Sequence, residues 1–182
     1  MLIILFLSRR VIIVVGYSKY IYYYMAVHSN KKSMQYEALQ EMLEVAEYCI
    51  LFDKSKDSRW ADHVGCYGYP AAILLLSIAD CIGSIIENKG AEYSVVNNLN
   101  ILNNAKYYNL NLSASELEDV RLLYRNKLTH NAYIGANNFL SIGEAGSPVM
   151  EGLSNGMYIL NLKPFLEITK SVVRLFVGDD HA

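Results

Sequence analysis

Residues 70–89 constrain the fold most, because they are almost continuously apolar over the length of one helix. On a helical wheel the apolar side chains lie nearly all round. The narrow polar stripe consists of Ser77, Asp80, Ser84 and Glu87. A helix of this kind must be covered by other elements, so it is typical of the centre of a helical bundle. Pro70 fits its first turn and Gly90 its end.

The remaining segments predict the partners of this helix. Apolar residues at helical spacing predict an amphipathic helix over 34–52, and residues 53–69 are a loop. Residues 92–108 are rich in asparagine and predict a short or broken helix. Ser113 and Glu116 match a capping box that opens a helix over 114–131. A last helix begins near Pro164.

Only one short segment favours a strand. Residues 133–156 are glycine-rich and predict a loop, while residues 157–162 (MYILNL) fit a short strand or hairpin. The predicted fold class is therefore all-α, a bundle of four to five helices with at most this one short extended element.

Residues 1–33 differ from the rest of the chain. They hold five basic residues and no acidic one, and their two apolar runs are split by Ser8-Arg9-Arg10. Neither run reaches the roughly 18 residues of a membrane span, and the charges are misplaced for a signal peptide. Three interpretations stay open: a surface membrane anchor, a β-prone extra element, or upstream sequence translated from a start codon set too early. We favour the third and assign the domain to residues 34–182.

Charge and cysteine content limit the function classes. Residues 34–182 carry 11 basic and 18 acidic residues, a net charge of −7. Such a body disfavours broad nucleic-acid binding, so any RNA contact has to be local. Three cysteines, two of them in predicted helices, favour a reducing, cytoplasmic compartment over a disulfide framework. We expect no stable membrane span.

The segment Leu122–Asn131 carries the chemistry. With 100° per residue, Val120, Leu123, Tyr124 and Leu128 form an apolar face. Arg125, Asn126, Thr129 and His130 fill the opposite arc, interrupted by Leu122. A leucine within a polar face suggests a second packing surface, so we expect a homodimer with Leu122 near its twofold axis.

Arg125 and His130 suit phosphodiester chemistry. An arginine can hold an oxyanion bidentately, and a histidine moves protons near neutral pH. The two lie about 140° apart on a regular helix, so they meet only if the helix loosens near Asn131 or if a symmetry mate brings a second pair across a twofold axis. Without further support, a solvated arginine and a histidine at a helix C-terminus explain the same residues.

The pattern Arg125-Asn126-x-x-x-His130, late in an acidic-bodied helical bundle, resembles the R-x(4-6)-H motif of the HEPN superfamily. The resemblance extends over residues 34–177, including Gly68-Tyr-Pro-Ala and the apolar helix with Asp80 and Gly83. It implies a dimer with the motif at its interface and a metal-independent endoribonuclease in a toxin–antitoxin or phage-defence role. Arg125 and His130 would be the catalytic pair and Asn126 the polar helper.

The resemblance also implies partners. These are an RNA substrate and an antitoxin protein, and no cofactor or metal is expected. In some HEPN toxins a partner modifies a tyrosine two residues after the histidine, but this chain has Ala132 there and Tyr133 one residue later. The alternative function is a non-catalytic HEPN-like dimer that binds a protein or a nucleotide.

Several further residues are weaker candidates. Arg121, Thr129 and Asp80 are secondary site residues: Asp80 could orient Arg121 or Arg125, although a solvent-facing carboxylate is the interpretation we favour. Asp62, His63 and Cys66 lie close together in sequence but lack the further ligands that a zinc site needs. Cys66 lacks an orienting partner for nucleophilic catalysis. Trp60, Tyr67 and Tyr69 could stack on bases, but we expect them to anchor the loop.

Overall fold

The computed structural model describes residues 2–7, 10–15, 25–26, 31–60, 63–86, 98–136, 138–153 and 157–178. The chain divides into two compact units, residues 1–38 and 39–182. In the first unit, β1 (Leu2–Leu7) pairs antiparallel with β2 (Arg10–Val15), with Leu2 opposite Val15, and β3 (Met25–Ala26) pairs with β2. The backbone of these two apolar runs is thus extended.

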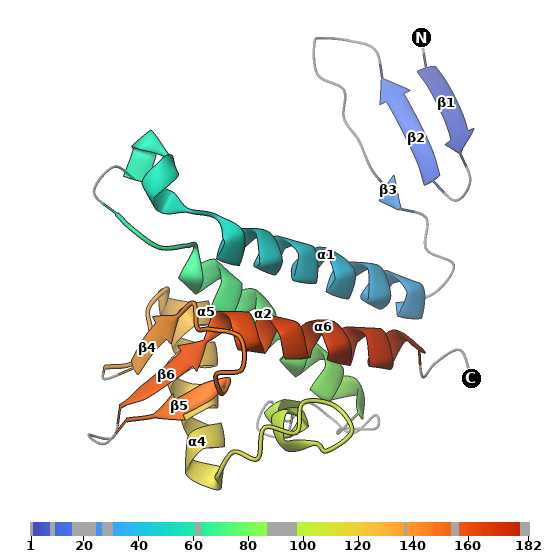
Figure 1. Ribbon diagram of the computed structural model, residues 1–182. Helices are drawn as coiled ribbons and strands as arrows, with labels where there is room; N and C mark the ends of the chain where they lie inside the picture. Colours follow the sequence, from blue (N-terminus) through green and yellow to red (C-terminus); the bar gives the residue numbers. More distant parts are fainter. Residues whose placement is uncertain are drawn as a thin grey trace. The chain divides into compact units, whose positions relative to one another are not determined.

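The second unit is dominated by helices. Helix α1 (Lys31–Leu51) lies where residues 34–52 predict it, and its residues from Leu39 onward belong to this unit. It buries one stripe, namely Leu39, Leu43, Ala46, Cys49 and Ile50. Lys170 of α6 (Leu162–Gly178) donates a hydrogen bond to Glu47 of α1 at 2.7 Å, and Figure 1 shows these two helices side by side.

Helix α2 (Gly68–Ile86) is the central helix that its composition predicts. It contacts α6 and also the segments η3, η4, α5 and β4, whose bounds follow below. Its buried side consists of Ala71, Ala72, Leu75, Leu76, Ile78, Ala79, Ile82 and Gly83. By length and composition it is the one described helix that could cross a membrane, but a core helix has the same properties.

The loop between α1 and α2 contains two short 3-10 turns, η1 (Lys54–Lys56) and η2 (Ser58–Trp60). Beyond α2 the description resumes at Asn98, and η3 (Leu99–Asn103) is a 3-10 helix, so the described part of residues 92–108 matches the prediction of a short helix. Leu99, Ile101 and Leu102 of this turn are buried.

The predicted helix over 114–131 is formed, but with an irregular middle. It consists of α4 (Ala114–Asp119), the π-helical segment η4 (Val120–Asn126) and α5 (Lys127–Asn131), called the motif helix below. The capping box is present as predicted: Ser113 and Glu116 each accept a hydrogen bond from the other's backbone N–H. The helix ends at Ala132, which has a left-handed conformation with φ of 56°.

The expectation of an all-α fold is wrong in one respect, because the helices are joined by a small mixed sheet. The predicted strand appears as β6 (Tyr158–Asn161). It pairs in parallel with β4 (Asn138–Ser141) and antiparallel with β5 (Met150–Gly152), both inside the predicted loop. These two strands are too short and glycine-flanked to show a period of two, so only pairing with β6 defines them. The fold is predominantly helical rather than purely α.

Candidate functional site

The motif helix is held in the fold by its apolar side. Val120, Tyr124 and Leu128 are buried, as the helical wheel predicts, and Leu123 is half-buried. The single proton of the Tyr124 hydroxyl is shared in a bifurcated hydrogen bond between the carbonyl of Tyr158 at 2.9 Å and that of Phe139 at 3.2 Å. Burial raises the pKa of Tyr124. This side chain therefore ties the helix to both β4 and β6.

The π-helical segment changes the geometry assumed for the motif. A π-helix bonds residue i to i+5, so each residue turns by less than the 100° used for the regular wheel. The segment covers Val120–Asn126 and so includes Arg125 and Asn126. The loosening thus lies within the motif rather than near Asn131, where the sequence argument placed it. Single turns of this kind are frequent at functional sites.

The sequence analysis favours a solvent-facing carboxylate for Asp80, and the structure shows that this interpretation is wrong. Its side chain is only 14% exposed, and its Oδ2 accepts a hydrogen bond from Nη2 of Arg125 at 2.6 Å. Its Oδ1 accepts from Nδ2 of Asn98 at 2.8 Å. Helix α2 contacts both η4 and α5 of the motif helix, and Asp80 is a residue of α2 that meets the arginine.

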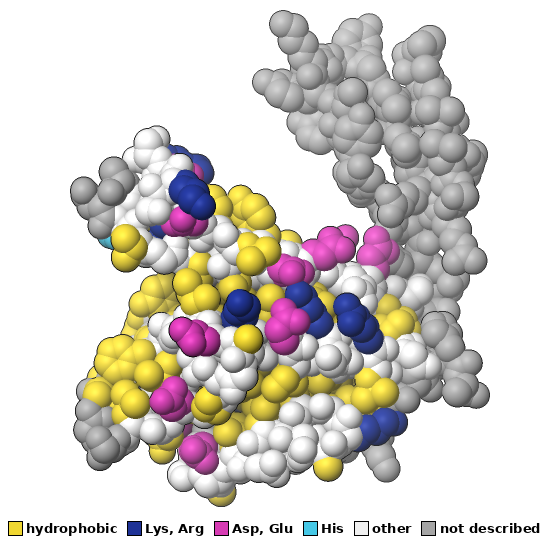
Figure 2. Space-filling model, in the orientation of Figure 1, with side chains coloured by type: hydrophobic (Ala, Val, Ile, Leu, Met, Phe, Trp, Pro, Cys, Tyr) yellow, Lys and Arg dark blue, Asp and Glu magenta, His cyan; other side chains and the backbone are white. Residues whose placement is uncertain are grey.

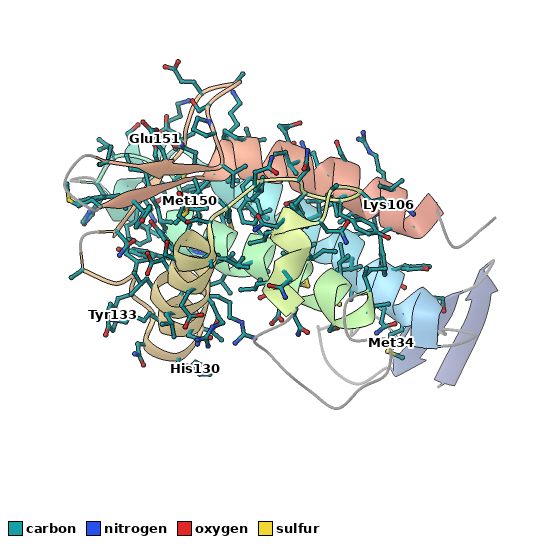
Figure 3. The ribbon with its side chains drawn as sticks, turned by 90° about the horizontal axis from the view of Figure 1, so that it is seen from below. Met34, Lys106, His130, Tyr133, Met150 and Glu151 are labelled. Carbon is teal, nitrogen blue, oxygen red and sulfur yellow. The ribbon has the colours of Figure 1, made fainter. Side chains whose placement is uncertain are left out.

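The two motif residues differ in their surroundings. Arg125 is largely buried, and its described polar contacts are Asp80 and a long bond from Nη1 to Oδ1 of Asn126 at 3.4 Å. His130 is exposed, close to the C-terminus of α5. Figure 3 shows His130 on the outside of the packed helices. Tyr133, also labelled there, is exposed as well. Within one chain the described contacts do not join Arg125 to His130.

The remaining predicted site residues lie around these two. Asn126 is half-buried and Thr129 is exposed. Arg121 does not reach Asp80, because its guanidinium binds the carboxylate of Glu118 one turn earlier, Nε donating at 2.7 Å. That hydrogen bond lowers the pKa of Glu118. Leu122 is 39% exposed within the chain, which leaves it available to a second surface.

The loop candidates do not form a chemical site in the described structure. Asp62 lies outside the described residues, and His63 packs edge-on against Trp60. Burial raises the pKa of the Cys66 thiol and that of Cys81, which disfavours either thiolate as a nucleophile. Among the described His, Cys, Asp and Glu residues, no group of three or more could hold a metal ion.

Two of the three loop aromatics anchor the loop rather than stand free. Trp60 donates a hydrogen bond to the Tyr67 hydroxyl at 3.1 Å, and the Tyr67 ring stacks on Phe52 at 4.4 Å. Tyr69 is exposed.

An open hollow of about 560 Å³ lies at the end of α1 and the η1–η2 turns, and Figure 2 shows hydrophobic side chains beneath these protruding turns. Its lining is Tyr48, Leu51, Phe52, Asp53, Lys56, Asp57 and Ser58.

Sequence reasoning missed Asn98 and the pairing of Glu118 with Arg121. The second pair could have been found, since residues three apart on a helix are neighbours. Gly83 was also a usable signal: a Cβ there would lie 1.9 Å from the carbonyl oxygen of Asn98, and a glycine inside a helix often marks a close approach. Nothing local connects Asn98 with Asp80, which is 18 residues earlier.

Comparisons with protein-family models, with curated proteins and with solved structures find no match to this chain. The candidate site is therefore described by its own geometry: a partly buried arginine oriented by a carboxylate, an exposed histidine five residues later, and an exposed leucine on the same helix.

Proposed function

We propose that this protein is a metal-independent endoribonuclease of HEPN type that acts as a homodimer in a toxin–antitoxin or phage-defence role. The observation that carries the proposal is the arrangement of the motif helix. It exposes His130 and Leu122, and it carries Arg125 in an orientation that Asp80 of another helix fixes. A purely structural helix end would need neither the exposed leucine nor an arginine fixed by a residue of another helix.

The chemistry follows from the two side chains. The 2′-hydroxyl of RNA attacks the adjacent phosphorus, its proton is removed, and the 5′-oxygen leaves with a proton. His130 supplies the imidazole that takes up and releases protons, and in a dimer its two copies supply one base and one acid. Arg125 stabilises the charge that develops on the phosphoryl oxygens, with Asn126 assisting. The products are a 2′,3′-cyclic phosphate and a 5′-hydroxyl.

The dimer is needed because one chain does not bring the pair together. The described contacts of Arg125 do not include His130, whereas two motif helices packed across Leu122 would place two arginines and two histidines in one cleft. The net charge of −7 over residues 34–182 then confines RNA contact to this cleft.

The test is to incubate purified protein with a mixed RNA pool in EDTA and to map the new ends. We expect cleavage without added metal, cyclic phosphate ends, and resistance of substrates with a 2′-deoxy group at the scissile nucleotide. His130→Ala and Arg125→Lys should each slow cleavage about a hundredfold or more. The lysine keeps a charge beside Asp80 but loses the planar fork.

Matched controls are His63→Ala and Arg174→Ala, which remove an exposed histidine and an exposed arginine elsewhere. They should cleave like wild type. Equal background cleavage by all variants, or activity only with added divalent metal, would contradict the proposal. Expression of active protein, but not of His130→Ala, should arrest bacterial growth if the role is that of a toxin.

A second function is favoured by one specific observation. The Nη2 of Arg125 is already bound to Asp80, so part of its charge is neutralised before any phosphate arrives. A non-catalytic dimer that binds a protein or a nucleotide would need no free arginine. Absence of cleavage together with a dimer that depends on Leu122 would support this function instead.

A further inference from the structure

Asp80 is held from two sides. One carboxylate oxygen accepts from Arg125 at 2.6 Å and the other from Asn98 at 2.8 Å, and both Asp80 and Arg125 are mostly buried. Asn98 itself is fixed, because its backbone lies so close to α2 that only a glycine at position 83 leaves room for it. The carboxylate therefore cannot turn without breaking a contact, and its orientation determines that of the guanidinium.

The contact with Arg125 is end-on, through Nη2 alone. Nε of Arg125 is buried and has no hydrogen-bond partner in the described structure, while Nη1 makes only the 3.4 Å contact with Asn126. Of the two terminal nitrogens of Arg125, Nη1 is thus the one less engaged by the protein. A phosphate oxygen approaching the motif helix would compete with a weak bond at Nη1 and with a strong one at Nη2.

Resting on the function proposed above, we infer that Asp80 is a positioning residue with two opposing effects. It fixes the Arg125 guanidinium for the transition state, which raises the cleavage rate. It also places a negative charge against the same guanidinium, which weakens the hold of Arg125 on the phosphate of bound RNA. Neutralising Asp80 should therefore tighten RNA binding and slow cleavage, whereas simple structural damage would weaken both.

The test is Asp80→Asn, which keeps the shape of the side chain and an oxygen acceptor for Asn98. We expect the rate at saturating RNA to fall about ten- to a hundredfold, the cost of a misplaced catalytic group. The dissociation constant for a 2′-deoxy-substituted, uncleavable RNA should fall several-fold. The slope of its logarithm against the logarithm of salt concentration should steepen by about 0.7, one additional phosphate contact on a single strand.

Three variants separate the explanations. Glu47→Gln, which neutralises an interhelical ion pair of similar length between α1 and α6, should change neither rate nor affinity. Asp80→Glu should recover part of the rate, because it restores the charge. In an Arg125→Ala background, Asp80→Asn should produce no further change in RNA affinity, because Asp80 acts through Arg125.

The outcomes are distinguishable. Suppose that wild type cleaves RNA. If Asp80→Asn then cleaves equally well, or if this variant loses both cleavage rate and RNA affinity while its thermal unfolding transition is unchanged, the positioning role is refuted and the nuclease proposal stands. If Asp80→Asn is unfolded, the partial recovery in Asp80→Glu decides. If wild type does not cleave, the proposed function fails and this inference falls with it.

Discussion

The two sides of the motif helix differ in how fully their groups are engaged within the chain. On the inward side, Tyr124 is completely buried and its hydroxyl bonds two strand carbonyls. On the outward side, Leu122 and His130 are exposed, and within the described residues the His130 side chain has no polar contact with another element. Arg125 lies between the two sides, paired with Asp80 but partly accessible.

This difference teaches that stability and activity can be altered separately on one helix. Changes on the inward side should cost free energy of unfolding, because they remove packing and hydrogen bonds together. Changes on the outward side should leave unfolding almost unaffected and alter assembly or chemistry instead. Two substitutions on the motif helix test whether its two sides are as distinct as the contacts indicate, and a third on α2 tests the packing next to it; they are ordered by their expected effect on stability.

The largest effect is expected from Tyr124→Ala. It removes a fully buried aromatic side chain at the junction of the motif helix with β4 and β6, and should lower the free energy of unfolding by about 3–5 kcal/mol. Urea denaturation followed by circular dichroism measures it. Tyr124→Phe keeps the ring and loses only the hydroxyl, so about 1–3 kcal/mol is expected. A loss below 1 kcal/mol for the alanine variant would show that the inward side does not anchor the helix.

An intermediate effect is expected from Gly83→Ala on α2. Helix propensity alone would make this change stabilising by about 0.5–1 kcal/mol. The new Cβ would meet the Asn98 carbonyl at 1.9 Å, so overpacking should reverse the sign and cost about 1–3 kcal/mol. Chemical denaturation of Gly83→Ala and of Gly68→Ala measures the two free energies of unfolding side by side. Gly68→Ala is the control, since a Cβ at position 68 has its nearest neighbour at 3.5 Å. Equal behaviour of the two variants would disprove the close approach of Asn98.

The smallest effect on stability is expected from Leu122→Glu on the outward side. Because this leucine is 39% exposed within the chain, unfolding of the monomer should change by no more than about 0.5 kcal/mol. Its assembly should change completely: we expect wild type to be a dimer and the variant a monomer in light scattering. A variant that stays dimeric through this face would remove the basis for the twofold axis at Leu122.

Much of the helical framework was predictable because it rests on local patterns. The period of apolar residues located α1, the nearly continuous apolar run located α2, and Pro164 marked the beginning of α6. The side chains of Ser113 and Glu116 marked the start of the motif helix. The strands β4 and β5 were not predictable, because each has at most four residues and is defined by its pairing with β6.

In the candidate site, too, some features were predictable from local spacing and others were not. The spacing alone predicts that Val120, Tyr124 and Leu128 belong to the core and that Leu122 lies on the opposite arc, and the structure buries the first three and exposes Leu122. The π-helical segment could not be foreseen, since no residue in it differs visibly from an ordinary α-helix former. The pairing of Asp80 with Arg125 was weighed but not preferred, because a polar stripe on a helix is more often directed to solvent.

The sequence by itself determined which segments are helical, where the motif helix begins and which of its residues turn inward. These properties depend on neighbours within about four residues, so a single chain segment contains the information. Only the tertiary structure decided that Asp80 reaches Arg125 across 45 residues of chain and that Asn98 shares the same carboxylate. Those contacts depend on how closely α2 is approached by η3 and by the motif helix. At η3 the approach is so close that a Cβ at position 83 would lie 1.9 Å from the carbonyl oxygen of Asn98, a matter of packing between distant segments rather than of any local pattern.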